Sequence, residues 1–158
     1  MGFVKNFKYE FIEDEDKKFE VVDSIVSKLP KWFDENGRKD YPETARKQIL
    51  LVAFDDEVVV GFVALQHNND YTSNIYSTGV LEEYHGNGIG RMLVNKAENY
   101  LRENGFRFLT VKTLSDSSDY EPYKKTRAFY KGVGFYPLEE NKEIWGKENP
   151  CLTMIKNI

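Results

Sequence analysis

At residues 80–91 the chain reads Val80-Leu-Glu-Glu-Tyr-His-Gly-Asn-Gly-Ile-Gly-Arg91, with a glycine at every second position from 86 to 90. The stretch joins an apolar run that is typical of a strand to the strongest helical pattern of the chain. Glycine permits the sharp bend that this junction needs and lets a ligand approach the backbone N–H groups without a Cβ in the way. Because N–H groups at a helix N-terminus attract anions, the turn predicts a phosphate or pyrophosphate site.

Two familiar phosphate-binding motifs do not fit this turn. A P-loop needs Gly-Lys-Ser or Gly-Lys-Thr, which the sequence does not contain. A dinucleotide fingerprint needs its third glycine where the chain has Arg91, and an acidic residue about twenty positions later, where the chain has Leu109, Thr110 and Val111. The glycines alone leave two interpretations open: a different phosphate site, or a flexible turn that caps a helix and binds nothing.

The segment His85-Gly-Asn-Gly-Ile-Gly90 resembles the coenzyme A turn of the GNAT superfamily of N-acyltransferases, Gln/Arg-x-x-Gly-x-Gly/Ala. Both glycine positions match, whereas His85 replaces the usual Gln or Arg. A second segment, Thr126-Arg-Ala-Phe-Tyr-Lys-Gly-Val-Gly-Phe135, looks like the superfamily's aromatic-Tyr pair followed by Gly-Phe. Residues 112–152 are similar to an uncharacterised bacterial branch of the superfamily. The resemblance extends from about residue 50 to the C-terminus and says little about residues 1–48, which shape the acceptor pocket in this fold.

Hydrophobic periodicity predicts the element order β-α-α-β-β-β-α-β-α-β-β in one domain over residues 1–158. Strands are predicted at residues 3–11, 49–54, 58–65, 75–81, 108–114, 135–138 and 152–155. Helices are predicted at residues 16–29, 42–47, 88–104 and 123–131, with a loop or short irregular helix at 31–41. Hairpins mixed with crossover helices favour an α/β (α+β) fold, a mixed, mostly antiparallel sheet flanked by helices. The resemblance implies the same, the GNAT (acyl-CoA N-acyltransferase) fold.

The sequence also predicts three local features of these elements. Asp16 is predicted to cap the first helix, and Pro42 to lie in the first turn of the second. The runs 49–54 and 58–65, separated by three acidic residues, predict a hairpin. One side of the helix at 88–104 is predicted to be lined by Ile89, Met92, Leu93, Ala97, Tyr100 and Leu101.

Composition limits the classes of partner. A formal charge of −4 argues against nucleic-acid binding. The chain contains no apolar run long enough to span a bilayer, and its first residues lack the core of a signal peptide. The single cysteine, Cys151, excludes an intramolecular disulfide and a cysteine-rich metal site, and is expected to be a small apolar residue of the last strand. We expect a cytoplasmic protein without metal, nucleic-acid or membrane partners, for which a homodimer is allowed.

The resemblance implies direct transfer of an acetyl group from acetyl-CoA, as co-substrate, to a primary amine of a small molecule or peptide. Tyr130 matches the family tyrosine that protonates the leaving thiolate, and a phenol suits that task because both groups titrate above neutrality. The fourth predicted strand should splay from the fifth and offer its backbone to the pantetheine arm and the oxyanion. The expected coenzyme A contacts are Gly79, Val80, Leu81, His85, Gly86, Asn87, Gly88, Ile89, Gly90, Arg91, Tyr123 and Lys131, with Lys124 as a further phosphate contact.

Several assignments stay open at the level of sequence. Gly79 suits a bulge or a close approach to the backbone better than a regular strand. The basic cluster Lys124, Lys125, Arg127 and Lys131 fits phosphate binding or a solvated face. Candidates for the general base are Asn74, Tyr76, Asp119, Glu121 and a water chain; candidates for the acceptor site are Trp32, Phe33, Tyr41, Tyr71 and Trp145.

The sequence leaves two classes of function open. An acetyltransferase would need a proton donor, and Tyr130 favours that class. The alternative is a non-catalytic acyl-CoA-binding sensor or interaction module. The acidic balance of the chain favours a cationic amine as acceptor, because such a surface attracts cations.

Overall fold

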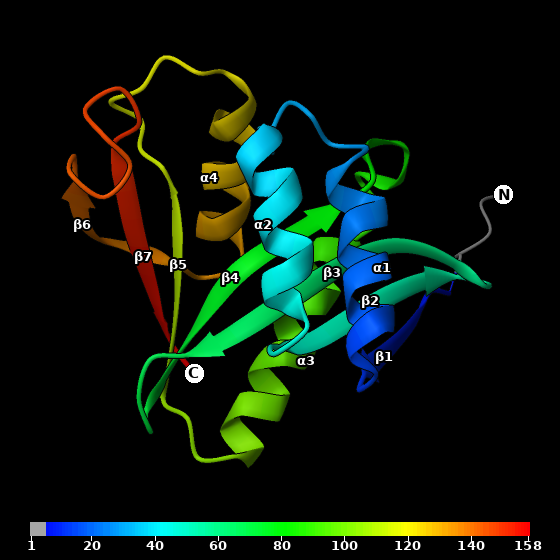
Figure 1. Ribbon diagram of the computed structural model, residues 1–158. Helices are drawn as coiled ribbons and strands as arrows, with labels where there is room; N and C mark the ends of the chain where they lie inside the picture. The colour runs from blue at the N-terminus through cyan, green and yellow to red at the C-terminus, as the bar shows by residue number, and fades with distance from the viewer. Residues whose placement is uncertain (1–5) are drawn as a thin grey trace, which may run out of the picture. The chain divides into compact units, whose positions relative to one another are not determined.

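The computed structural model describes residues 6–158, so residues 3–5 of the first predicted strand lie outside the described residues (Figure 1). The predicted element order is confirmed, with a 3₁₀ turn, η1 (Glu82–Tyr84), in addition. The elements are β1 (Lys8–Ile12), α1 (Glu15–Val26), α2 (Glu35–Ala45), β2 (Ile49–Asp55), β3 (Val58–His67), β4 (Thr72–Val80), α3 (Ile89–Glu103), β5 (Phe108–Leu114), α4 (Pro122–Gly132), β6 (Tyr136–Asn141) and β7 (Cys151–Asn157).

The seven strands form one sheet in the order β1-β2-β3-β4-β5-β7-β6. The β1–β2, β2–β3, β5–β7 and β6–β7 pairs are antiparallel, whereas β4 and β5 are parallel, so the predicted mixed, mostly antiparallel sheet is confirmed. The parallel pairing runs from Thr72 opposite Phe108 to Ile75 opposite Val111. The hairpin predicted around three acidic residues is the β2–β3 hairpin, in which Asp56 adopts a φ of 53°.

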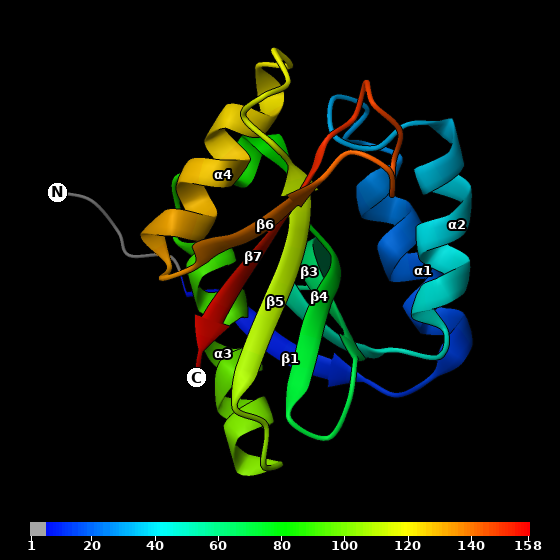
Figure 2. The same cartoon turned by 90° about the vertical axis from the view of Figure 1, so that its left-hand side faces the viewer.

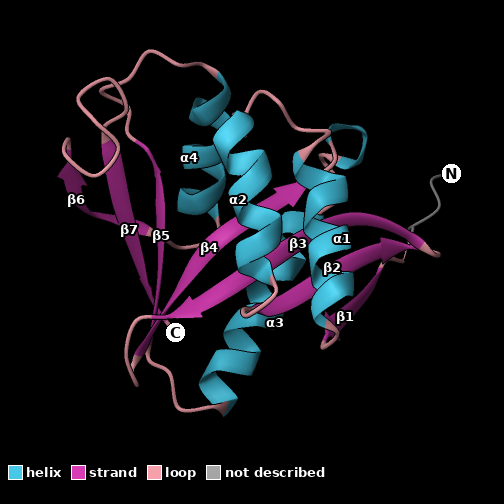
Figure 3. Cartoon of the chain, in the orientation of Figure 1, coloured by secondary structure: helices cyan, strands magenta, loops and turns pink. Residues whose placement is uncertain are grey.

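Residue contacts divide the chain into two compact units. The first comprises the residues up to Leu65 together with Ser77–Ala97, and the second comprises Gln66–Tyr76 and Glu98–Ile158. In the first unit α1 and α2 lie side by side over β2 and β3 (Figures 1 and 2). In the second, β5, β7 and β6 are neighbours and α4 packs against β5 (Figure 3). That residues 1–158 form a single domain stays a prediction.

The core of the first unit explains why α1 is a helix. Its apolar positions recur at helical spacing, and the side chains of Val22, Ile25 and Val26 are almost completely buried. They pack with buried residues of β2 and β3, among them Leu50, Val52 and Phe62. Complete burial of one such side chain contributes roughly 1.5–3 kcal/mol, so this face, and not intrinsic propensity, holds the helix in place.

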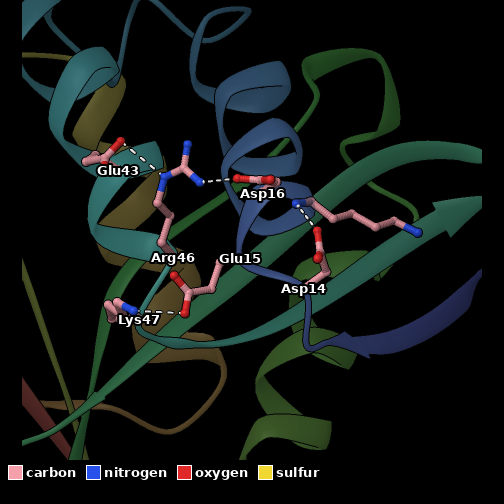
Figure 4. A network of polar contacts seen from close by, with 7 residues as sticks. Asp14, Glu15, Asp16, Glu43, Arg46 and Lys47 are labelled. Atoms are coloured by element: carbon pink, nitrogen blue, oxygen red, sulfur yellow. Dashed lines mark hydrogen bonds and ion pairs between the residues drawn. The ribbon is translucent and has the colours of Figure 1, made fainter.

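The cap of α1 differs from the prediction. Asp14, not Asp16, is the N-cap, and its Oδ2 accepts the N–H of Lys17 at 2.8 Å. Asp16 instead pairs with Arg46 at the end of α2, with Nη1 to Oδ1 at 2.6 Å (Figure 4). Lys47 pairs with Glu15 at 2.8 Å in the same network. Both aspartates are plausible caps by sequence, and the structure distinguishes them by where the helix begins.

Residues 31–41 were predicted as a loop or short irregular helix and residues 42–47 as a separate helix; the structure instead has one helix, α2, which begins at Glu35 and ends at Ala45. Asp34 caps it through a bond from the Gly37 N–H to Oδ1 at 2.8 Å. Residue 37 of this helix lies close to the Tyr41 ring, because an added Cβ would be only 3.0 Å from it. Glycine at this position avoids that crowding. Pro42 therefore lies inside the helix and not in its first turn. It removes one backbone donor, and packing of α2 against α1 compensates for the loss.

The predicted face of α3 is correct at most positions. Ile89, Leu93, Ala97 and Leu101 are buried, as expected. Met92 is 42% exposed, however, and is not part of the core. The buried positions that the pattern missed are Val94 and Glu98. A carboxylate breaks the apolar pattern, and Glu98 is buried because an ion pair neutralises it.

Replacing Asp14 tests the cap. Asp14→Ala removes the acceptor for the Lys17 N–H and should lower the free energy of unfolding by about 1 kcal/mol. The midpoint of thermal unfolding should fall by about 2–4 °C for a chain of this size. Asp14→Asn keeps a side-chain oxygen and should behave like the parent protein. A larger loss in Asp16→Ala than in Asp14→Ala would contradict the assignment, because the Asp16 ion pair is exposed.

Candidate active site

The glycine turn forms an open helix N-terminus. Gly86 and Gly88 have φ of 84° and 77°, a conformation that favours glycine, and α3 begins at the next residue. The Met92 N–H donates to the Gly88 carbonyl at 3.0 Å and so starts the helix. Among residues 6–158, a Cβ at either glycine would meet nothing within 4 Å, and the first turn of α3 carries no acidic side chain. The space beside these N–H groups can therefore accept an anion.

Side chains of the turn hold its backbone. The Asn87 amide donates to the Tyr84 carbonyl at 2.9 Å, which closes the turn locally. Nε2 of His85 lies 2.8 Å from the Val80 carbonyl oxygen. A carbonyl can only accept, so Nε2 carries the hydrogen and is engaged within the chain. Only Nδ1 of His85 is left for a phosphate, and it would donate only in the doubly protonated imidazolium form, so the predicted phosphate contact stays a prediction.

The backbone of β4 beside the turn is only partly available. The Leu81 N–H donates to the Val60 carbonyl of β3 at 3.0 Å. Because successive residues of a strand direct their backbone groups to opposite edges, Gly79 and Leu81 face β3 whereas Val80 faces away from it. Of the three residues predicted to bind pantetheine, Val80 is therefore the one whose N–H points away from β3, where it can pair with a ligand.

Gly79 lies where the end of α1 approaches the sheet. A Cβ at Gly79 would be 3.0 Å from Leu29 Cδ1 and 3.1 Å from Ile25 Cγ2. On the neighbouring strand, a Cβ at Gly61 would be 3.1 Å from the Gly79 carbonyl oxygen. Gly79 thus lies within β4 and is closely approached, but by side chains of the first unit's core, and its predicted contact with coenzyme A stays a prediction.

Tyr130 is fixed at the C-terminal end of α4 in the second unit. The Phe135 N–H donates to the Tyr130 carbonyl at 2.9 Å, and the Gly134 N–H donates to the Lys131 carbonyl at 3.1 Å. This pair of bonds, with Gly134 at a φ of 102°, is a Schellman motif. The Tyr130 ring is 4% exposed and meets the rings of Phe129 and Phe135 edge-on, at 5.5 and 5.6 Å between centroids.

The basic cluster divides into two kinds of residue. The Arg127 guanidinium donates to the Leu114 carbonyl at 2.8 Å, so it ties α4 to the end of β5. Lys124 and Lys131 are exposed on α4, and Tyr123, in the same helix, is half-buried beside Tyr120 at 6.0 Å between centroids. Arg91 is exposed in the first turn of α3, in the other unit. The exposed lysines and Arg91 keep the charge that phosphate binding would need.

The candidates for the general base differ in their surroundings. Asn74 is buried, and its Oδ1 accepts the Thr110 hydroxyl at 2.8 Å. Tyr76 is 38% exposed, and Asp119 and Glu121 are also exposed. An amide does not take up a proton near neutrality, so Asn74 is better suited to hydrogen bonding than to proton abstraction.

The aromatic candidates for the acceptor site differ in their unit and in their contacts. Phe33 and Tyr41 pack edge-on at 5.5 Å between centroids and contact the core of the first unit. Trp32 also contacts that core, and its ring lies 6.0 Å from the His85 ring, next to the glycine turn. Tyr71 and Trp145 belong to the second unit and are 61% and 42% exposed. Trp32 is therefore the aromatic that the structure brings to the predicted turn.

Cys151 lies buried in β7, as predicted for a small apolar residue. Burial raises the pKa of its thiol. The thiol therefore stays protonated near neutrality, which disfavours an acyl-cysteine intermediate. Among residues 6–158, no cluster of three or more His, Cys, Asp or Glu side chains could bind a metal ion. In the same range, no helix has the length and apolar character needed to cross a membrane.

Solved structures share this fold. A protein assigned to the GNAT family from Desulfovibrio desulfuricans superposes with a TM-score of 0.84 and 16% identity over 96% of this chain and 99% of its own. A GNAT family acetyltransferase from Elizabethkingia anophelis, solved with acetyl-CoA bound, gives a TM-score of 0.71 and 13% identity over 97% and 99% of the two chains. At these identities the likeness shows a shared fold and no more.

The sequence match establishes the family. Residues 9–135 match the model of the Acetyltransferase (GNAT) family, and the chain belongs to that family. An uncharacterized N-acetyltransferase of Chlorobaculum tepidum is 33% identical over 96 residues, which are 59% of this chain and 55% of that relative. The matched segment thus spans about half the length of the curated relative. The superfamily resemblance of the two glycine motifs is confirmed.

Two glycines at opposite ends of α3 test the turn as an anion site. Gly88→Ala and Gly105→Ala each put a Cβ on a glycine with positive φ, 77° and 86°, in open space. Each should cost the fold about 1 kcal/mol. Only Gly88→Ala should weaken acetyl-CoA binding, by at least tenfold or about 1.4 kcal/mol, because its Cβ enters the space for the pyrophosphate. Isothermal titration measures the affinity, and equal affinities of the two variants would contradict the site.

Proposed function

We propose that this chain transfers the acetyl group of acetyl-CoA directly to a primary amine of a small molecule or peptide. The observation that carries the proposal is the glycine turn, an open helix N-terminus without acidic side chains, in a member of the acetyltransferase family. The acetyl-CoA bound to the Elizabethkingia anophelis relative supports the choice of donor. One family model matches parts of both units, which supports a single functional domain over residues 1–158.

The turn would bind the pyrophosphate of the coenzyme. The helix dipole and the N–H groups around Gly88 favour a negative charge there. Exposed cations on α3 and α4 would contact the outer phosphates, where they need little desolvation. The proposed contacts of the turn and of these cations are His85, Gly86, Asn87, Gly88, Ile89, Gly90, Arg91, Lys124 and Lys131, with Tyr123 as an additional contact.

The backbone of β4 would bind the pantetheine arm as an added strand pairs with a sheet edge. Val80 is the principal partner in this proposal, because its N–H faces away from β3. Its carbonyl is already bonded to His85, so Val80 would act as a donor, toward the arm or the oxyanion. Gly79 and Leu81 would contribute close contact more than hydrogen bonds.

Tyr130 would supply the proton that the reaction needs at sulfur. In the chemistry that acetyl-CoA supplies, the amine nitrogen forms a bond to the thioester carbonyl carbon and the carbon–sulfur bond breaks. The Tyr130 hydroxyl would donate its proton to the departing sulfur and later regain one from water. The proton lost by the amine would pass to solvent. A phenol is matched in pKa to a thiol, so neither transfer is strongly uphill.

The acceptor is proposed from charge. A chain with a formal charge of −4 attracts cations, and amine substrates are cationic near neutrality. Trp32 would line the acceptor side of the turn, since its ring lies against His85. The same proposal places the protein in the cytoplasm, with acetyl-CoA and an amine as partners and without a metal, and it allows a homodimer.

Tyr130→Phe tests the proton donor. The change keeps the ring that packs on Phe129 and Phe135 and removes only the hydroxyl. Turnover should fall by a factor of about 10²–10⁴ in kcat, with the KM for acetyl-CoA little changed. Thiol release with a good amine acceptor measures both constants.

Tyr136→Phe is the matched control, because Tyr136 is 73% exposed on β6 and should tolerate the loss of its hydroxyl. Full turnover in Tyr130→Phe would mean that water or another group protonates the sulfur. Tight acetyl-CoA binding by the parent protein without turnover on any amine would instead favour a non-catalytic acyl-CoA sensor.

A further inference from the structure

The Lys156 ammonium group of β7 lies at the C-terminal end of α4. Its Nζ donates to the Val133 carbonyl at 2.6 Å, and Val133 is the C-cap residue of that helix. The last carbonyls of a helix have no partner within it and carry the negative end of the helix dipole. A cation that donates to one of them satisfies an acceptor and opposes the dipole at the same time.

Glu98 of α3 neutralises this cation. Its side chain is 6% exposed, and Oε1 lies 2.6 Å from Lys156 Nζ. The carboxylate thus compensates the charge of an ammonium group that also donates a hydrogen bond to Val133. Arg102 lies farther off, 3.6 Å from the other carboxylate oxygen, with its side chain 46% exposed.

Gly134 makes room for the lysine side chain. A Cβ at Gly134 would lie 3.0 Å from Lys156 Cε and 3.2 Å from Nζ. Gly134 also has a φ of 102°, which other residues rarely adopt. The positive φ therefore favours glycine here, and the absence of a Cβ lets the Lys156 side chain pass close beside the turn.

The same few residues fix Tyr130. The Tyr130 carbonyl accepts the Phe135 N–H, and Val133 and Gly134 are the residues in between that shape the turn. A shift of Val133 would change this bond and the edge-on contact of the Tyr130 and Phe135 rings. We propose that Lys156, with Glu98 as its counter-ion, is a positioning residue that orients Tyr130 for proton transfer. This inference rests on the proposed function.

Stability alone is a weak reason for such an arrangement. Buried ion pairs often contribute no more than apolar residues of the same size, because removing two charges from water is costly. The ammonium group of this pair nevertheless also donates a hydrogen bond to the turn that carries Tyr130. Such a bond fixes the position of the turn, and catalysis depends on the placement of reacting groups within about 1 Å.

Replacing the two cations that pair with Glu98 separates positioning from ion pairing. Lys156→Met keeps the length of the side chain and removes the bond to Val133, whereas Arg102→Met removes only the more exposed partner. We expect kcat to fall by about tenfold or more in Lys156→Met, as for a small displacement of a catalytic group, with the KM for acetyl-CoA unchanged. Arg102→Met should keep the parent kcat. Circular dichroism at the assay temperature verifies folding.

A second variant protects the test against a folding failure. Glu98→Gln combined with Lys156→Met removes both buried charges together, a change that proteins often tolerate. It also lacks the bond to Val133, so it should show the same loss of kcat. A folded double variant with the parent kcat would overturn the proposal.

The Tyr130→Phe background identifies the group through which Lys156 acts. If Lys156 orients the Tyr130 hydroxyl, Lys156→Met should cause no further loss of kcat once that hydroxyl is absent. An equal loss in both backgrounds would overturn the positioning role while the proton-donor role stands. Full activity in Tyr130→Phe alone would refute the proton-donor role itself, and the positioning role with it.

Discussion

The hydrogen bond from the Met92 N–H to the Gly88 carbonyl starts α3 directly after a residue with a φ of 77°. An ordinary residue at position 88 would be strained, and a capping side chain would compete for the first N–H groups of the helix. Glycine avoids both, so the N-terminus of α3 stays open, and no other described residue lies within 4 Å of where a Cβ at position 88 would be. Every other proposed contact with the coenzyme depends on this opening.

A second glycine at positive φ fixes the other half of the proposed chemistry. Gly134 ends α4 in a Schellman motif, and Tyr130 is the residue whose carbonyl closes it. Gly134 combines a left-handed backbone with close passage of the Lys156 side chain, which pairs with Glu98. A helix terminus with a glycine at positive φ therefore underlies each half of the proposal: Gly88 in the first unit at the proposed anion site, and Gly134 in the second beside the proposed proton donor.

Local sequence patterns were sufficient to predict most of the helices and strands and the glycine turn. Alternating glycines before a strongly amphipathic helix predicted the turn, and two apolar runs around three acidic residues predicted the β2–β3 hairpin. The sequence failed where a contact between distant residues decides the outcome. Pro42 inside α2 is tolerated because α1 packs against that helix, and Asp16 pairs with the distant Arg46 while Asp14 caps α1. Glu98 and Lys156 lie 58 residues apart, and no local pattern connects them. That Tyr130 and the glycine turn act on the same acetyl-CoA molecule is inferred from family membership and stays a proposal.

The most direct test of the central claim is to incubate the protein with acetyl-CoA and a panel of small and peptidic amines. Free thiol and acetylated amine are then quantified together. The account predicts that both products form in equal amounts with at least one cationic amine, and that neither forms when the amine is omitted. Tight binding of acetyl-CoA without either product, across the whole panel, would contradict an acetyltransferase and favour an acyl-CoA sensor.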